Sequence, residues 1–111
     1  MSDLSLLRIE YTATENKNEI LSKIAIKLLR APINSLNEND ITFKNLVYEI
    51  INENNSYLFI NNLFEQIRVG ANRDPFGMWL NMKKVVSVIC NNNEIKERWL
   101  KQMPKQGTQE H

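Results

Sequence analysis

Apolar residues recur three and four positions apart along most of this chain, a spacing that places them on one face of an α-helix. The chain has only three Gly and three Pro, so few positions interrupt these stripes. The stripes and their end signals predict an all-α fold, a single compact bundle of four to five antiparallel helices. Four of the predicted helices cover residues 17–30, 56–69, 75–90 and 94–103.

Polar residues that can cap a helix precede the stripes. Asn16 with Glu19 three positions later fits a capping box, and Asp74 with Pro75 is a strong helix start. One of Asn39, Asp40 and Thr42 is a candidate cap for a further helix that reaches Ile51. Ser56 is a candidate cap for the next helix, and the asparagines at 91–93 offer one for the last helix.

Pro and Gly mark the predicted helix ends. Pro32 disfavours helical geometry in the residue before it, so residues 32–39 are predicted to form a connecting loop. Gly70 stands where a helix over 56–69 would need a residue able to adopt the left-handed conformation. Gly77 lies inside the first turn of a predicted helix, where we expect it to be a local weakness.

The predicted helix over 56–69 is apolar around much more than one face. Such a helix is expected to lie at the centre of the bundle, with neighbours on several sides. Phe64 is therefore predicted to be buried, and Phe64→Ala to cost on the order of 3–5 kcal/mol. The apolar residues of this helix are Tyr57, Leu58, Phe59, Ile60, Leu63, Phe64 and Ile67.

The opening segment, residues 4–12, fits two patterns. Leu7, Ile9 and Tyr11 alternate with polar residues as in a half-buried strand, whereas Leu4, Leu7 and Tyr11 share one face of a helix. We predict a short helix, because a single strand would have no evident partner elsewhere in the chain.

A chain of 111 residues can bury a core without disulfides but is too short for two such cores. We expect a helical bundle domain over residues 1–104 and a flexible C-terminal tail over 105–111. The sequence has no run of 18 apolar residues and no secretory signal pattern at Met1. These observations predict an intracellular protein, cytoplasmic or nuclear, that has no membrane partner.

Residues able to carry catalysis or bind metal are scarce. One Cys and one His cannot form a Cys/His zinc site, and no Gly-rich phosphate loop is present. Cys90 ends an apolar helix and is expected to be a small buried hydrophobic residue. Glu15 and Glu19 share a helix face, as do Glu49 and Glu53, but such pairs are common on exposed surfaces. We expect no enzymatic activity, no cofactor and no metal.

Basic residues are concentrated in the second half of the chain. Residues 56–111 carry eight Lys and Arg against five Asp and Glu, although the formal net charge of the chain is only +1. A basic patch on the last two predicted helices would bind phosphates, whereas the alternative is that these are ordinary solvated helix faces. The residues of this predicted patch are Lys83, Lys84, Lys96, Arg98 and Lys101.

Met and Trp side chains gather in the same region, and flexible Met beside Trp is typical of surfaces that accommodate a protein partner. The same side chains can instead complete the core, which is the favoured interpretation for Trp79 and Trp99. We predict that at least one of Met78, Trp79 and Trp99 is partly exposed in the free chain. The predicted partner-binding residues are Arg73, Phe76, Met78, Trp79, Met82 and Trp99.

The predicted function is therefore that of a non-enzymatic protein-interaction module, an adaptor or regulator whose partner is another protein. Asn occurs 16 times and Ile 12 times, an excess that accompanies AT-rich codons and suggests a viral or phage protein that engages host machinery. The alternative is a nucleic-acid-binding or transcription-associated helical domain that uses the basic C-terminal surface.

Overall fold

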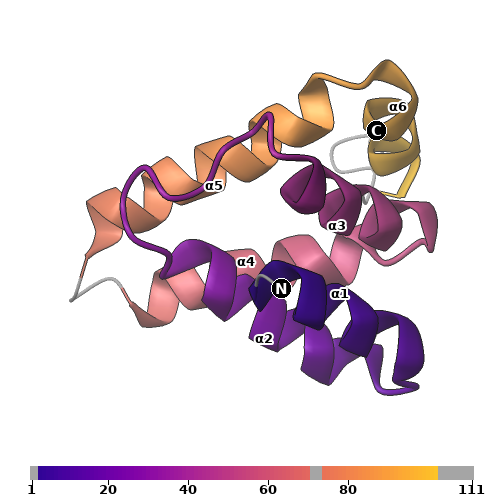
Figure 1. Ribbon diagram of the computed structural model, residues 1–111, viewed down its shortest axis with the longest axis horizontal. Helices are drawn as coiled ribbons and strands as arrows, with labels where there is room; N and C mark the ends of the chain where they lie inside the picture. Colours follow the sequence, from indigo (N-terminus) through magenta and orange to yellow (C-terminus); the bar gives the residue numbers. More distant parts are fainter. Residues whose placement is uncertain (1–2, 71–73, 103–111) are drawn as a thin grey trace, which may run out of the picture.

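The computed structural model describes residues 3–70 and 74–102, and within them every element is an α-helix (Figure 1). The predicted all-α bundle is confirmed, with six helices in these residues rather than four or five. The predicted tail, residues 105–111, lies outside the described residues. The helices are α1 (Asp3–Ala13), α2 (Lys17–Leu29), α3 (Ile41–Asn52), α4 (Ser56–Val69), α5 (Pro75–Cys90) and α6 (Asn93–Gln102).

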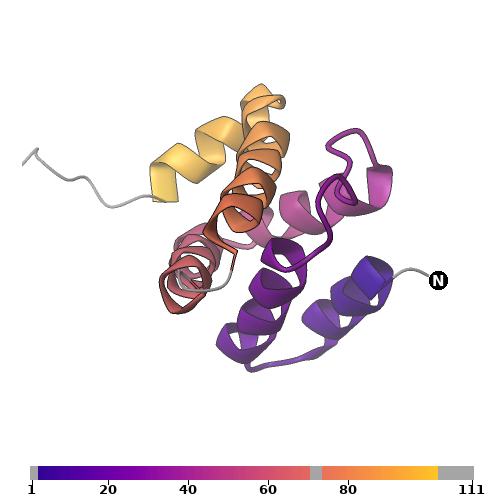
Figure 2. The same cartoon turned by 90° about the vertical axis from the view of Figure 1, so that its left-hand side faces the viewer.

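The additional helix is the opening segment, which is α1 and not a strand. Figures 1 and 2 show α1 lying alongside α2 at one edge of the molecule, and α1 also contacts α3. Tyr11 is fully buried, and its hydroxyl accepts a hydrogen bond from Asn55 Nδ2 at 2.6 Å. Burial raises the pKa of Tyr11 to about 12. This contact ties α1 to the junction between α3 and α4.

Four helix starts are capped by the predicted residues. Gly77 makes one of these caps possible, because a Cβ at this position would lie 2.3 Å from Asp74 Oδ2. A larger residue here would have to displace the Asp74 carboxylate that caps α5. In each cap a backbone N–H donates to the side chain of the cap residue: Glu19 to Asn16, Thr42 to Asp40, Gly77 to Asp74 and Ile95 to Asn92.

The start of α4 differs from the prediction, because Ser56 does not cap it. Ser56 is buried in the first turn of α4, and the cap residue Asn55 makes no side-chain cap hydrogen bond. Gln102 of α6 takes this role. Its Oε1 accepts hydrogen bonds from the Ser56 backbone N–H, at 2.9 Å, and from the Ser56 hydroxyl. Its Nε2 donates to the Ile51 carbonyl at 2.8 Å, so one side chain joins the end of α3 to the start of α4.

Gly70 ends α4, but not through a left-handed conformation, since its φ is −92°. A Cβ on Gly70 would lie 2.4 Å from Met78 Cε. A larger residue here would make the end of the Met78 side chain shift, because Met78 of α5 packs directly against the end of α4. The predicted helix end at Gly70 is confirmed, whereas the left-handed conformation expected there is wrong.

The core is built on the packing of α2 against α4, to which α1, α3 and α5 add their apolar faces. Phe64 is 48% exposed, so the prediction that Phe64 is buried is wrong. The buried residues of α4 occupy one side of the helix, and its neighbours cover only that side. The fully buried side chains at the centre of this packing are Leu21, Ile24 and Leu28 of α2 and Phe59 and Leu63 of α4.

A buried polar side chain fixes α5 relative to α2. Asn81 is 2% exposed, and its Nδ2 donates to the carbonyls of Leu29 at 3.0 Å and Ala31 at 2.9 Å. These carbonyls stand at the end of α2, where the helix supplies no N–H of its own. Asn81 therefore completes α2 and holds the middle of α5 against it.

Adjacent residues of α4 provide a test of this packing. Leu63 is fully buried, so Leu63→Ala is expected to lower the free energy of unfolding by about 2–5 kcal/mol. Phe64→Ala is expected to cost about 1 kcal/mol or less, because it removes mainly a surface aromatic contact. Urea denaturation measures both. A larger loss for Phe64→Ala than for Leu63→Ala would contradict the structure.

Gln102→Ala tests the link between α6 and the α3–α4 junction. The variant leaves the buried Ser56 N–H without an acceptor, and we expect it to lower the free energy of unfolding by about 2 kcal/mol. Lys101→Ala, at the exposed neighbouring residue, should change it by no more than about 0.5 kcal/mol. Equal effects of the two substitutions in urea denaturation would show that Gln102 does not cap α4.

Candidate functional site

Two aromatic rings from different helices meet at the surface. Phe64 of α4 and Trp79 of α5 make an edge-to-face contact, with ring centroids 6.2 Å apart and an interplanar angle of 63°. Phe64 is 48% exposed and Trp79 47% exposed. Phe76, 69% exposed, stands three residues before Trp79 and so on the same side of α5. These three residues form the aromatic patch.

The position of the patch follows from how α5 uses its apolar residues. Met78, Met82 and Val85 are buried against the bundle, and Asn81 holds the same side of α5 against α2. Trp79 therefore faces outward. The α4 and α5 helices run in opposite directions on either side of residues 70–74 (Figure 1), which brings Trp79 next to Phe64.

The structure divides the predicted partner-binding residues into two groups. Phe76 and Trp79 lie on the aromatic patch, so the prediction that at least one of Met78, Trp79 and Trp99 is partly exposed is confirmed, and the favoured core position for Trp79 is wrong. Met78 and Met82 are buried core residues. Trp99 is half-buried and packs against the core from α6, and Arg73 lies outside the described residues.

Phe64 was predicted to be buried and not to belong to a surface site. A signal was present, because Phe59, Leu63 and Ile67 are spaced four apart and already form a complete buried stripe. Phe64 lies off that stripe. An apolar residue beyond a full stripe needs a further neighbour to be buried, and the bundle supplies none at this position.

The predicted basic patch is partly neutralised by nearby carboxylates. Lys84 Nζ donates to the Leu36 carbonyl at 3.3 Å and lies 3.8 Å from Glu38 Oε1. Arg98 Nη2 lies 4.0 Å from Glu94 Oε2. The other predicted members are exposed; they are Lys83 on α5 and Lys96 and Lys101 on α6.

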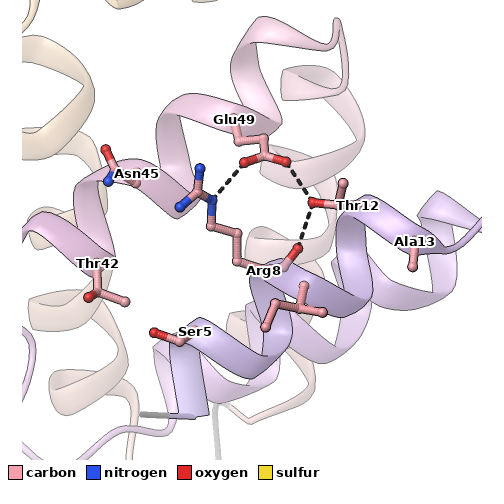
Figure 3. Close-up of a pocket in the computed structure, with 8 residues that line it drawn as sticks. Ser5, Arg8, Thr12, Ala13, Thr42, Asn45 and Glu49 are labelled. Atoms are coloured by element: carbon pink, nitrogen blue, oxygen red, sulfur yellow. Dashed lines mark hydrogen bonds and ion pairs between the residues drawn. The ribbon is translucent and has the colours of Figure 1, made fainter. Parts of the chain in front are cut away.

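A second surface feature is an open hollow of about 630 Å³ between α1 and α3. Figure 3 shows Arg8 and Thr12 of α1 reaching the two carboxylate oxygens of Glu49 on α3. Arg8 Nε donates to Oε1 and the Thr12 hydroxyl to Oε2, each at 2.7 Å. Glu53 lies beside a different cation, 3.9 Å from Lys17 Nζ, so the paired carboxylates of the sequence have separate partners.

These contacts determine the charge state of Glu49. Partial burial raises its pKa, but the hydrogen bonds from Arg8 and Thr12 outweigh burial and leave the pKa below its ordinary value. Glu49 is therefore ionised at neutral pH and forms a neutral pair with Arg8. The hollow thus has a neutral floor, and its polar groups join α1 to α3.

Cys90 is exposed at the end of α5, so its predicted burial is wrong; the last residue of α5 lies past the contacts that cover Val88 and Ile89. Across residues 3–70 and 74–102, no three His, Cys, Asp or Glu side chains are placed to hold a metal ion. None of the described helices combines the length and apolar character needed to cross a bilayer.

Comparison with known proteins adds no relative. No protein family, no curated protein sequence and no solved structure matches this chain.

The Arg8–Glu49 pair predicts a specific dependence of stability on pH. Because the folded-state pKa of Glu49 is below the reference value of 4.5, its contribution to stability is present above pH 4.5 and is lost as the pH falls through the folded-state pKa. Glu49→Gln should therefore lose less stability on acidification than the wild type, measured by urea denaturation at several pH values. Glu15→Gln, the same change at an exposed residue outside the hollow, should keep the wild-type profile. Identical profiles for wild type and Glu49→Gln would contradict this assignment.

Proposed function

We propose that this chain is a non-enzymatic protein-interaction module, an adaptor or regulator, that binds a protein partner through the aromatic patch. The observation that carries the proposal is the half-exposed edge-to-face pair of Phe64 and Trp79, with Phe76 beside it. Large aromatic side chains are frequent anchors in protein interfaces, and Trp is among the residues most enriched there.

The exposed area of the patch supports this proposal. From their exposed fractions, the three side chains present about 300 Å² of aromatic surface to solvent. Contiguous apolar patches of roughly 300–600 Å² on monomeric proteins are often functional. A partner that covers these rings would remove their apolar surface from water.

The patch is also held in place before any partner arrives. Phe64 follows the fully buried Leu63, and Trp79 follows the buried Met78, so both rings stand on backbone that the core fixes. Edge-to-face contact further restricts the two rings. A preorganised surface loses little conformational entropy on binding, which favours its use as a docking site.

The hollow between α1 and α3 supports a structural role instead. Its charged groups, Arg8 and Glu49, neutralise each other, and Thr12 satisfies the second carboxylate oxygen. The exposed apolar residues of this region do not form a ring pair like that of the patch. The aromatic patch is therefore the surface on which we base the proposed function.

Single substitutions in the patch test the proposal. Phe76→Ser removes the most exposed ring of the patch, and we expect it to reduce partner capture from a lysate of the natural source at least about tenfold. The matched control is Ile41→Ser, because Ile41 is 66% exposed on α3. Quantitative mass spectrometry of nuclease-treated and untreated captures measures the effect.

Three outcomes of this experiment decide the proposal. A protein retained by the wild type and Ile41→Ser but lost with Phe76→Ser supports it. Equal capture by all three chains would show that the patch does not bind the partner. Captured material that disappears on nuclease treatment would instead favour the nucleic-acid-binding function.

A further inference from the structure

The turn between α5 and α6 is almost a continuation of the α5 helix. The Asn91 backbone is in the right-handed helical region, and its N–H donates to the Ser87 carbonyl, four residues back, at 2.9 Å. The helical pattern stops at Asn92, whose N–H reaches the Ile89 carbonyl at 3.4 Å and whose side chain caps α6 through the Ile95 N–H. A break at one residue therefore separates the two helices, and the chain changes direction there (Figures 1 and 2).

A change of backbone dihedral angles at Asn92 would join α5 and α6 into one helix over residues 75–102. In the bent turn, the N–H groups of Asn93 and Glu94 have no acceptor among the described residues. In a continuous helix they would donate to the carbonyls of Ile89 and Cys90, four residues back. The straight form is opposed by the Asn92 cap and by the poor helix propensity of Asn inside a helix.

The surface that α6 covers is built by three helices, α3, α4 and α5. On α6, Ile95 is buried, Trp99 is half-buried, and Gln102 donates to and accepts from the α3–α4 junction. These residues are spaced four and three apart, so they form a single stripe, the docking stripe of α6. The turn is the only described covalent connection between this stripe and the bundle. The same contacts can therefore be made by α6 of a second copy.

We infer that two copies of this chain exchange α6, with α5 and α6 forming one continuous helix in each copy and the docking stripe packing against α3, α4 and α5 of the other copy. The dimer keeps the contacts of the docking stripe and gains the hydrogen bonds of the straightened turn. It loses an intramolecular contact, for which the effective concentration is about 1 mM or more. We therefore expect a monomer in dilute solution and a measurable dimer at about 1 mM.

This inference goes beyond the proposed function and does not depend on it. Asn92 follows Trp79 by 13 residues, so the turn lies about 20 Å along α5 from the aromatic patch. Exchange of α6 therefore leaves the patch uncovered. The dimer would carry two aromatic patches, which would allow it to bind two partner sites at once and to gain avidity.

Two substitutions in the turn move the equilibrium in opposite directions. Asn92→Ala removes the cap of α6 and favours a continuous helix. Each dimer contains two turns, so a factor of about ten at each should lower the dimer dissociation constant about a hundredfold. Asn93→Pro should prevent exchange, because Pro is favoured at the first position of a helix and disrupts a helix interior.

Sedimentation velocity of the full chain from about 10 µM to about 1 mM measures these dissociation constants. Asn61→Ala is the matched control, the same change at an exposed residue of α4, and should behave as wild type. Trp79→Ser should also leave the dissociation constant unchanged, because exchange does not use the aromatic patch. Circular dichroism verifies that each variant is folded.

The position of α6 in the dimer is tested on the Asn92→Ala chain. Isotope-labelled and unlabelled copies are mixed at low concentration and then concentrated. In the mixed dimer, isotope-filtered NMR should detect Gln102 of one copy against Ser56 of the other, because these residues are hydrogen-bonded in the closed chain.

The outcomes decide the inference. A dimer that Asn92→Ala strengthens and Asn93→Pro removes, with the Gln102–Ser56 contact between copies, supports it. It is overturned if Asn92→Ala stays monomeric at about 1 mM, or if its dimer lacks that contact. A dimer of equal strength in wild type, Asn92→Ala and Asn93→Pro would overturn it as well. A dimer that Trp79→Ser dissociates would overturn it in favour of association through the aromatic patch.

Discussion

The packing of α2 against α4 determines the rest of this structure. Leu21, Ile24 and Leu28 face Phe59 and Leu63 in a fully buried contact, and no residue of this set carries a polar side chain. Burial of side chains of this size contributes roughly 1.5–3 kcal/mol each before the entropy of ordering them is counted. The contact fixes which side of α4 faces the core. As a result, the side of α4 that carries Phe64 faces away from the core.

Two polar side chains position the remaining helices around this centre. Asn81 completes the end of α2 and so sets the rotation of α5, which turns Trp79 outward. Gln102 completes the end of α3 and the start of α4, and so holds α6 against both. Each side chain replaces hydrogen bonds that a helix end lacks. The position of the Phe64–Trp79 pair at the surface thus follows from how the polar groups at the helix ends form their hydrogen bonds.

Local features of the sequence predicted the helices well. Asn16 and Asp74 cap the helices they precede, and the range 75–90 agrees with the structure at both ends. These features act within one turn of helix, so a short stretch of sequence contains all the residues involved. The opening segment fitted both patterns, and the helix was predicted because a single strand would have no evident partner elsewhere in the chain.

Features that depend on distant residues were not predictable in the same way. The cap of α4 comes from Gln102, 46 residues away from Ser56, and nothing near Ser56 indicates it. Phe64 was expected to be buried because apolar spacing shows which side chains could be covered, but not whether a neighbouring helix is present to cover them. The same limitation applies to Trp79 and to Cys90. Phe76 and Trp79 were predicted as partner-binding residues, and Phe64 completes the patch only in three dimensions.

The proposed function requires Trp79 to be open to solvent in the free chain. Acrylamide quenching of a Trp99→Phe variant measures this directly, since Trp79 is then the only indole. The indole N–H of Trp99 has no acceptor among the described residues, so this substitution removes no hydrogen bond. Because Trp79 is half-exposed, we expect strong quenching and red-shifted emission at low protein concentration, both reduced when a partner binds. Weak quenching with blue-shifted emission in the free, dilute chain would contradict it.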